Sequence, residues 1–385
     1  MRIPFVDTLL YRTFWGLDRL GRIRTVQDLA DVRLDELQSV LVAVTTALGD
    51  SICFTPALTA LRDRFPRARI VGLFHRAFAD LYRDDPRLDG VIPYWGKYAR
   101  WHRTLRALRA VRCELALAPY ISEPDVIPLI YLGGSRIIFR TPGRDTIYRF
   151  MVANPELLRQ GPTPEHALKQ AATMLRHLGC PLPDLSPRLH VTAGARERVA
   201  GWLRAQGVGG NVRLVALHPG ASVQNKRWPL GHYRSLARRL LATGQDVHLL
   251  LTGAPGERAL ARQIATALGS PGRVTEAAGA IRIEDLPALF ERVDVLISAD
   301  TGAAHVAYAM GTPSVTMFWR SDPALSGPMH DLDRHLVVAR EPLCPPCRTR
   351  SCKYPACAEE ITPERVLQST LALLGRREVT SGARR

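Results

Sequence analysis

A carboxylate, a hydroxyl and an imidazole follow one buried run of the chain in close succession. The apolar residues 295–298 are typical of a parallel strand, and residues 303–310 are good helix formers. The turn between them leaves backbone N–H groups free at the start of the helix, where open α/β folds bind anions. The alternative is an ordinary crossover in which the hydroxyl only caps the helix. The chemical groups of this turn belong to Asp300, Thr301, Gly302 and His305.

Two other turns carry side chains that could act on a substrate. Asp50 lies in the turn 45–51, and a carboxylate at such a point can accept a proton from a hydroxyl. Lys226 follows the apolar run 214–217, where an ammonium group can stabilise the charge of a phosphate. Each residue also has a simpler interpretation. Asp50 could cap a helix, Lys226 could be a solvated surface lysine, and His305 could be a packing histidine.

Buried runs alternate with helical stretches along most of the chain, which predicts parallel sheets. The 385 residues suit two domains of ordinary size, and three prolines within residues 180–187 predict the linker between them. The first strand–loop–helix unit lacks Gly-x-Gly-x-x-Gly, so no dinucleotide fingerprint is present. We predict an extension at 1–35, a first α/β domain at 36–182, a second at 190–342, and a region at 343–385 with a Cys-rich loop, a helix and a basic tail.

The formal net charge of +16 indicates an anionic partner, which could be nucleic acid, a membrane surface or an acidic substrate. No zinc-finger or RNA-recognition signature supports nucleic acid. No apolar run reaches the length of a transmembrane helix, and the N-terminus lacks the features of a signal peptide. We therefore predict a cytoplasmic protein that contacts the membrane peripherally.

Positive charge concentrates in two stretches of the first half. Residues 1–24 combine aromatic side chains with arginines, which is typical of a helix in a membrane interface, although a helix packed on the protein is the alternative. Residues 97–112 are predicted to form one basic helical segment, with arginines at a spacing of three near one face. That face is either plain solvated surface or a wall for an acidic substrate or anionic lipid. The arginines assigned to an acceptor are Arg100, Arg103 and Arg106.

Four cysteines lie close together near the C-terminus, in a proline-containing loop. Their thiolates could bind a structural zinc or iron, form a labile disulfide pair, or remain free. A catalytic role is not expected of them. The four residues are Cys344, Cys347, Cys352 and Cys357.

Several short motifs, taken in chain order, resemble one enzyme family. Together they resemble the lipopolysaccharide heptosyltransferases, glycosyltransferase family 9, over about residues 40–374. The motifs are Leu48-Gly49-Asp50, Thr55-Pro56-Ala57-Leu58, His218-Pro219-Gly220-Ala221, Lys226-Arg227-Trp228-Pro229, Gly253-Ala254, Asp300-Thr301-Gly302 with His305, and Gly311-Thr312-Pro313.

The resemblance implies a GT-B fold, in which two Rossmann-like domains face each other across a cleft. It implies inverting, metal-independent sugar transfer without a cofactor, usually from ADP-heptose to a hydroxyl of a lipopolysaccharide core or related glycan. The expected partners are thus a nucleotide sugar and an anionic glycolipid or glycan. By motif, Asp50 matches the catalytic base and Lys226 a catalytic lysine at the donor phosphates. The other donor-binding positions are Ser222, Glu257, Asp300, Thr301, Gly302 and His305.

The sequence departs from this family in its first 35 or so residues, which lie outside the family core. Ala221 also stands where a second donor-site hydroxyl is often found. Two other functions are alternatives to glycosyl transfer. A nucleotide-sugar epimerase of GT-B-like fold would act on the donor alone, and a non-catalytic protein would bind anionic polymers without turnover.

Overall fold

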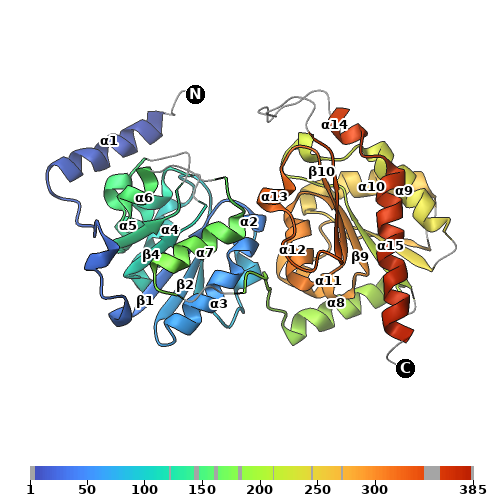
Figure 1. Cartoon of the computed structure of the whole chain (residues 1–385), viewed down its shortest axis with the longest axis horizontal. Helices are drawn as coiled ribbons and strands as arrows, with labels where there is room; N and C mark the ends of the chain where they lie inside the picture. The colour runs from blue at the N-terminus through green and yellow to red at the C-terminus, as the bar shows by residue number, and fades with distance from the viewer. Residues whose placement is uncertain are drawn as a thin grey trace. The chain divides into compact units, whose positions relative to one another are not determined.

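The structure is a computed structural model that describes residues 5–120, 123–142, 147–159, 164–180, 184–210, 212–243, 246–269, 272–341 and 356–382. The chain divides into two compact units, Met1–His190 and Val191–Arg385. Each unit contains a parallel sheet flanked by helices (Figure 1). The predicted α/β class with parallel sheets is therefore confirmed.

The first unit has a five-stranded parallel sheet in the order β3-β2-β1-β4-β5. Its central strand is buried along its full length, as expected for a strand covered on both faces. Because the chain moves outward from β1 to β3 and then returns to β4, the sheet has a topological switch point between β1 and β4. The strands are β1 (Ser39–Val44), β2 (Arg69–His75), β3 (Gly90–Tyr94), β4 (Leu115–Ala118) and β5 (Ile137–Arg140).

Helices of the first unit pack in pairs against its sheet. Those labelled α3 and α7 contact each other, and so do α4 and α5. Since α3 connects β1 to β2, whereas α4 connects β3 to β4 and α5 connects β4 to β5 in the opposite direction along the sheet, right-handed crossovers place the two pairs on opposite faces. The helices are α1 (Phe5–Arg19), α2 (Leu48–Cys53), α3 (Thr55–Arg64), α4 (Trp101–Val111), α5 (Val126–Gly133), α6 (Pro155–Arg159) and α7 (Ala167–His177).

The second unit has a six-stranded parallel sheet in the order β11-β10-β9-β6-β7-β8, with a switch point between β6 and β9. Its strands are β6 (Arg213–His218), β7 (Val247–Leu251), β8 (Val274–Glu276), β9 (Val295–Ala299), β10 (Ser314–Phe318) and β11 (His335–Ala339). Its helices are α8 (Ala193–Ala205), α9 (Leu230–Leu241), α10 (Arg258–Leu268), α11 (Leu286–Arg292), α12 (Gly302–Met310), α13 (Pro323–Ser326), α14 (Ala356–Glu359) and α15 (Pro363–Gly382).

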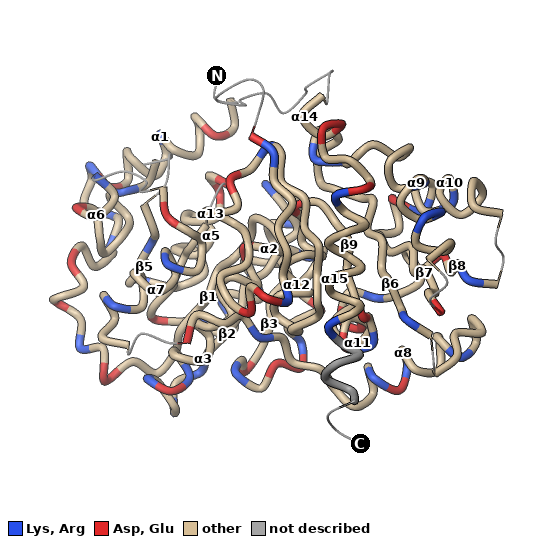
Figure 2. Tube along the Cα trace, turned by 45° about the vertical axis from the view of Figure 1, so that its right-hand side comes forward, with Lys and Arg blue, Asp and Glu red and all other residues tan. Residues whose placement is uncertain are grey.

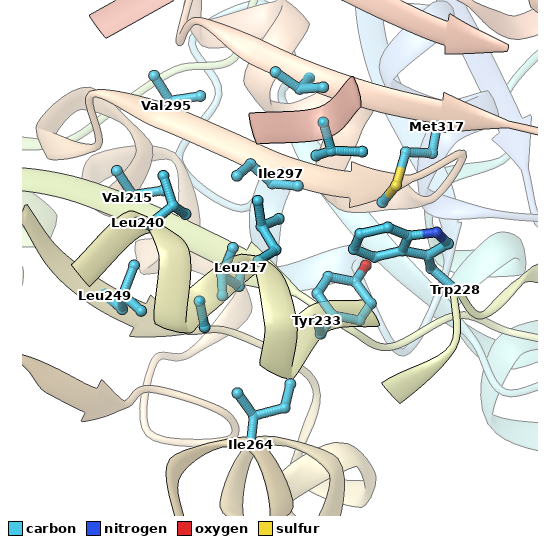
Figure 3. Close-up of a cluster of buried hydrophobic side chains, with 14 of the residues drawn as sticks. Val215, Leu217, Trp228, Tyr233, Leu240, Leu249, Ile264, Val295, Ile297 and Met317 are labelled. Atoms are coloured by element: carbon cyan, nitrogen blue, oxygen red, sulfur yellow. The ribbon is translucent and has the colours of Figure 1, made fainter. Parts of the chain in front are cut away.

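One buried cluster fills the space between this second sheet and α9, α10 and α15. Figure 3 shows Trp228 and Tyr233 side by side in it, near Met317. Both aromatic residues donate hydrogen bonds to backbone carbonyls. The Trp228 indole N–H donates to the Ile361 carbonyl at 2.9 Å, and the Tyr233 hydroxyl donates to the His218 carbonyl at 2.9 Å. These bonds tie the segment after β6, which carries Lys226, to the core.

The N-terminal segment folds as helix α1, which packs on the first unit; its contact with a membrane stays a prediction. On one face Phe14 is buried in the core of the first unit, and Asp7 accepts hydrogen bonds from Lys97 at 2.6 Å and Tyr98 at 2.5 Å. Other apolar side chains stay open to solvent: the exposed fractions are 80% for Phe5, 55% for Leu9 and 70% for the following Leu20. The helix therefore packs on the unit and still presents an apolar face.

Two local predictions are wrong. The predicted turn 45–51 is helical from Leu48, so Asp50 lies in the first turn of α2 and not in an open loop. The basic segment is not one helix either, because α4 begins only at Trp101. Residues 97–100 form a loop in which Tyr98 and Arg100 adopt left-handed backbone conformations. Lateral contacts of this loop with α1 and α5 outweigh the helical pattern of its sequence.

Candidate functional site

The switch point of the second sheet brings together two residues that lie 74 positions apart. Lys226 follows β6, and Asp300 follows the neighbouring strand β9. The Lys226 ammonium lies 2.7 Å from a carboxylate oxygen of Asp300, which also accepts a hydrogen bond from Ser321 at 2.5 Å. Nε2 of His305 lies 3.9 Å from the other oxygen. The three predicted residues thus form one network, to which Ser321 is an addition that the sequence did not suggest.

This network keeps Asp300 ionised. Burial of the carboxylate acts to raise its pKa, but the nearby Lys226 charge, hydrogen bonds from Lys226 and Ser321, and His305 together hold the pKa below its ordinary value. Since an ammonium group has three N–H donors and Asp300 occupies one or two of them, Lys226 retains capacity for a further acceptor. The Lys226 ammonium is therefore a half-buried cation that Asp300 holds at the carboxyl end of a parallel sheet.

The turn from β9 into α12 leaves donors unused beside this pair. Thr301 occupies the N-cap position of α12, but its side chain makes no capping hydrogen bond. Its hydroxyl oxygen is buried and has no hydrogen-bond partner in the part of the chain that the structure describes. The first N–H groups of a helix also lack intrahelical partners. The capping alternative for Thr301 is therefore wrong, and the turn offers unused polar groups together with the positive end of the helix dipole.

Glu257 lies against the glycines of two neighbouring strand ends. A Cβ atom at Gly220 would lie 2.0 Å from a Glu257 oxygen, and one at Gly253 would lie 3.1 Å from its Cβ, so a side chain at Gly220 would displace the carboxylate. Glu257 also accepts a hydrogen bond from the Ala254 N–H at 2.8 Å. Ser222 lies on the loop after β6 and is exposed. Ser222 on its loop and Glu257 in the 3-10 helix Pro255–Glu257 thus both follow strands at the carboxyl end of the second sheet.

The switch point of the first sheet holds two carboxylates beside a pair of threonines. Asp50 accepts a hydrogen bond from Thr46 at 2.5 Å. Glu123, which follows β4, accepts one from Thr45 at 3.1 Å, across the β1–β4 boundary. Sequence reasoning found Asp50 and missed Glu123. The signal that could have found it is its position just after the short strand β4, because parallel neighbours end at the same edge.

The three arginines assigned to an acceptor are separated by the fold. Arg100 precedes α4, and its guanidinium lies 4.2 Å from the centroid of the Trp95 ring. Arg103 and Arg106 lie on the exposed face of α4. Neither forms an ion pair or a ring contact with another described residue, so both lie on an exposed basic face.

Most of the cysteine motif falls on residues that the structure does not describe. Cys344, Cys347 and Cys352 lie outside the described ranges, and Cys357 is partly buried at the start of the C-terminal helical region. Within the described ranges no group of three or more Cys, His, Asp or Glu side chains could hold a metal ion. The three alternatives for these cysteines remain predictions.

Comparison with known proteins supplies the family. The model of Glycosyltransferase family 9 (heptosyltransferase) matches residues 150–358, more than half of the chain. The chain belongs to glycosyltransferase family 9. Lipopolysaccharide heptosyltransferase 1 of Pseudomonas aeruginosa is 25% identical over 369 residues, which cover 87% of this chain and 98% of the relative. Lipopolysaccharide heptosyltransferase 3 of Escherichia coli is 24% identical, over 71% of this chain and 81% of the relative.

Solved structures show the same fold for this family 9 glycosyltransferase. The glycosyl transferase family 9 protein of Veillonella parvula has a TM-score of 0.70 at 18% identity, covering 88% of this chain and 98% of that one. The Escherichia coli ADP-heptose LPS heptosyltransferase II has a TM-score of 0.66 at 22% identity, covering 88% and 99%. The predicted GT-B class, with two parallel-sheet α/β domains, is therefore confirmed.

The protein is thus an enzyme of the glycosyltransferase class, as predicted. The family match favours this over an epimerase or a non-catalytic polymer binder. No helix among the described residues combines the length and apolar character needed to cross a membrane.

Proposed function

We propose that this glycosyltransferase transfers heptose from ADP-heptose to a sugar hydroxyl of a lipopolysaccharide core or related surface glycan. The names of its relatives support the sugar and the acceptor class. The observation that carries the proposal is the paired Lys226 beside the unpartnered Thr301 hydroxyl at the N-terminus of α12. A cation, a hydroxyl and helix N–H groups at a switch point are the groups that a nucleoside diphosphate requires.

The second unit would hold the donor. In this proposal Lys226 and the α12 N-terminus bind the diphosphate, with Thr301, Gly302 and Ser222 donating further hydrogen bonds. Asp300 holds the Lys226 ammonium in place, and His305 borders the same carboxylate. Each fixed donor to the leaving group is typically worth about 3 kcal/mol of barrier.

Glu257 would bind the hydroxyls of the donor nucleoside. Its carboxylate is fixed by the Ala254 N–H and by the close packing of Gly220, and it keeps a second oxygen for a ligand. The two glycines therefore serve to leave room for this carboxylate.

The first unit would bind the acceptor and supply the base. Asp50 would accept the proton of the acceptor hydroxyl while that oxygen forms a bond to the anomeric carbon of heptose. The bond from this carbon to the diphosphate oxygen breaks, and its electron pair leaves with ADP, so the configuration inverts. The hydrogen bond from Thr46 holds one oxygen of Asp50 in position.

A panel of nucleotide sugars tests the donor. ADP-heptose should raise the unfolding temperature more than ADP-glucose, UDP-glucose or GDP-mannose, because a ligand that binds only the folded state stabilises it. Enzyme incubated with ADP-heptose alone should leave the sugar unchanged, and added core glycan should release ADP. An epimerised free donor, or equal shifts with all four nucleotides, would contradict the proposal.

We also propose that the enzyme works at the cytoplasmic face of the membrane, where α1 lies in the lipid interface. Its exposed side chains Phe5 and Leu9 are accompanied by Arg12 and Arg19, which anionic lipid would attract. Deletion of residues 1–24 would also remove the buried Phe14, so point substitutions are the sharper test.

Flotation with vesicles of anionic phospholipid measures this contact. The double variant Phe5→Ser with Leu9→Ser should lose most of the salt-sensitive binding, because it removes apolar side chains that make no core contact. The matched control is Leu332→Ser, an exposed leucine in the second unit with an exposed fraction of 61%. Equal flotation of the double variant and the wild type would mean that α1 only packs on the first unit and does not bind lipid.

A further inference from the structure

The linker segment 184–190, which ends the first unit, is bonded to the junction between α2 and α3. These two helices are consecutive (Figure 1), and only Phe54 separates them. The buried hydroxyl of Thr55, the first residue of α3, donates to the Ile52 carbonyl of α2 at 2.7 Å and accepts the Arg188 N–H at 3.0 Å. The linker is therefore tied to the end of the helix that carries Asp50.

Arg87 bonds to the same junction with all of its guanidinium donors. Its Nη1 atom donates to the Thr55 carbonyl at 3.1 Å and to the Thr59 hydroxyl at 3.3 Å, and Nη2 donates to the Arg188 carbonyl at 3.1 Å. Its Nε and Nη2 atoms also donate to the buried carboxylate of Asp85, at 2.8 and 2.6 Å. Since a guanidinium has five N–H donors in one plane, Arg87 is fully satisfied. It joins its own loop to the start of α3 and to the linker.

Hydrogen bonds matter here because the linker does not pack closely on α3. An open cavity of about 180 Å³ lies between them, lined by Pro56 and Ala60 of the helix and by Ser186 of the linker. Side chains that border such a space lose the packing contacts that would otherwise hold the two segments together. The attachment of the linker to α3 therefore depends on the bonds of Arg87 and Thr55.

Helix α2 needs tertiary contacts to hold Asp50 in place. It has only six residues, and its N-cap residue makes no side-chain capping bond, so it is too short to be stable by itself. The buried Tyr82 hydroxyl donates to the Ser51 hydroxyl of α2 at 2.9 Å. Tyr82 and Arg87 both come from the connection between β2 and β3. This one connection thus holds α2 directly at Ser51 and, through Arg87, at its junction with α3.

We propose that Arg87 is a positioning residue for the sugar transfer, which acts on Asp50 through the α2–α3 junction. The inference rests on the proposed function, in which Asp50 takes the proton of the acceptor hydroxyl. A base must lie within hydrogen-bond distance of that hydroxyl, and a displacement of about 1 Å can lower a rate by about 100-fold. Because Arg87 also bonds to the linker, the position of the base depends on the segment that leads to the second unit.

Steady-state kinetics of the full-length enzyme with ADP-heptose and core glycan test this role. Arg87→Lys keeps a positive charge beside Asp85 but loses the planar set of donors that reaches α3 and the linker together. Turnover should fall by about tenfold, because the base is less well placed. The KM for the donor should stay unchanged, since the proposed donor groups belong to the second unit. Thr55→Val, which removes the hydroxyl, should lower turnover in the same way, and Thr55→Ser should restore it.

Combination with Asp50→Asn separates positioning from a general loss of structure. In the variant without the base, adding Arg87→Lys should lower the residual turnover by less than about twofold, because no base is left to position. An arginine with only a structural role would lower turnover by the same factor in both backgrounds. Asp50→Asn by itself reports on the proposed function. If that variant keeps wild-type turnover, the proposed base is wrong, whereas hydrogen exchange still decides whether Arg87 holds α2.

Amide hydrogen exchange, measured by mass spectrometry, follows the contact without the reaction. Peptides that cover residues 48–55 and 184–190 should both exchange about tenfold or more faster in Arg87→Lys than in the wild type. The matched control is Arg198→Lys in the second unit, because Arg198 also binds a buried carboxylate, that of Asp285, through Nε and Nη2. This control should keep wild-type turnover and wild-type exchange in both peptides.

The inference is overturned by any of three results. Wild-type turnover in folded Arg87→Lys would show that the reaction does not depend on this residue. An equal loss of turnover with and without Asp50 would make Arg87 a structural residue only. Unchanged exchange at residues 48–55 would mean that α2 is held without it. If Arg87→Lys does not fold, Thr55→Val undergoes the same three tests.

Discussion

The two sheets place charge at the carboxyl ends of their strands in opposite ways. In the second unit Lys226 and Asp300 neutralise each other, and Ser321 and His305 complete the network. In the first unit Arg76 and Arg100 share one indole ring without a carboxylate partner among the described residues. Figure 2 shows Lys and Arg positions spread along both units with Asp and Glu among them, so the net charge of +16 does not predict this difference.

The difference separates two ways of binding an anion. A paired lysine is held in position before the ligand arrives, and the ligand uses its remaining donors together with those of a helix N-terminus. Two arginines without carboxylate partners repel each other. An anion bound beside them would relieve that repulsion. The first arrangement suits a diphosphate leaving group that must be stabilised during the reaction.

The largest effect is expected at the carboxylate of the first switch point. Asp50→Asn should lower turnover by roughly 100-fold or more while ADP-heptose affinity stays unchanged, because it removes a general base and no donor contact. Steady-state kinetics at saturating donor and acceptor measure this. Asp63→Asn, an exposed acid on α3, is the control. Near wild-type turnover in the Asp50 variant would mean that Asp50 is not the general base.

The next effect concerns the paired lysine of the second switch point. Lys226→Ala should weaken ADP-heptose binding by roughly 10- to 100-fold, because it removes a charge-assisted contact to the diphosphate and leaves Asp300 to repel it. Calorimetry gives the affinity, and Lys169→Ala on the exposed side of α7 is the control. If donor affinity stays at the wild-type value, the ion pair is structural and the comparison between the two units fails.

The same ion pair predicts a dependence of stability on pH. Because the pKa of Asp300 is lowered in the folded protein, this carboxylate stabilises the fold above its unfolded pKa. That contribution is lost as the pH falls through the folded pKa. Denaturant unfolding of wild type and Asp300→Asn at pH 7 and pH 3 should therefore show a smaller acid loss in the variant. Identical losses would mean that the pair contributes nothing to stability.

The smallest effect is expected at the second carboxylate of the first switch point. Glu123→Gln should lower turnover by less than about tenfold, because its amide can still accept a hydrogen bond from Thr45 and another residue carries the proton. The same kinetic assay decides between the two acids. If Glu123→Gln lowers turnover as much as is expected for Asp50→Asn, Glu123 and not Asp50 would be the general base.

Sequence reasoning found the residues at strand ends and misplaced some of the elements that hold them. The long buried runs before Asp300 and Lys226 predicted β9 and β6, since a covered parallel strand leaves a continuous apolar signal. The three-residue strand β8 and the edge strand β11 gave no such signal and were not predicted. Asp50 was assigned to a turn because the helix around it is only six residues long.

The sequence by itself determined the two parallel-sheet units, the enzyme family and which polar side chains follow the strands. These properties depend on apolar runs and on short motifs, and both are local in the chain. Only the tertiary structure decided which side chains meet. The pairing of Lys226 with Asp300, the exposed face of α1 and the approach of Arg76 and Arg100 to Trp95 each join distant segments. Such contacts are set by strand order and register, because neighbouring parallel strands end at one edge whatever their separation in sequence.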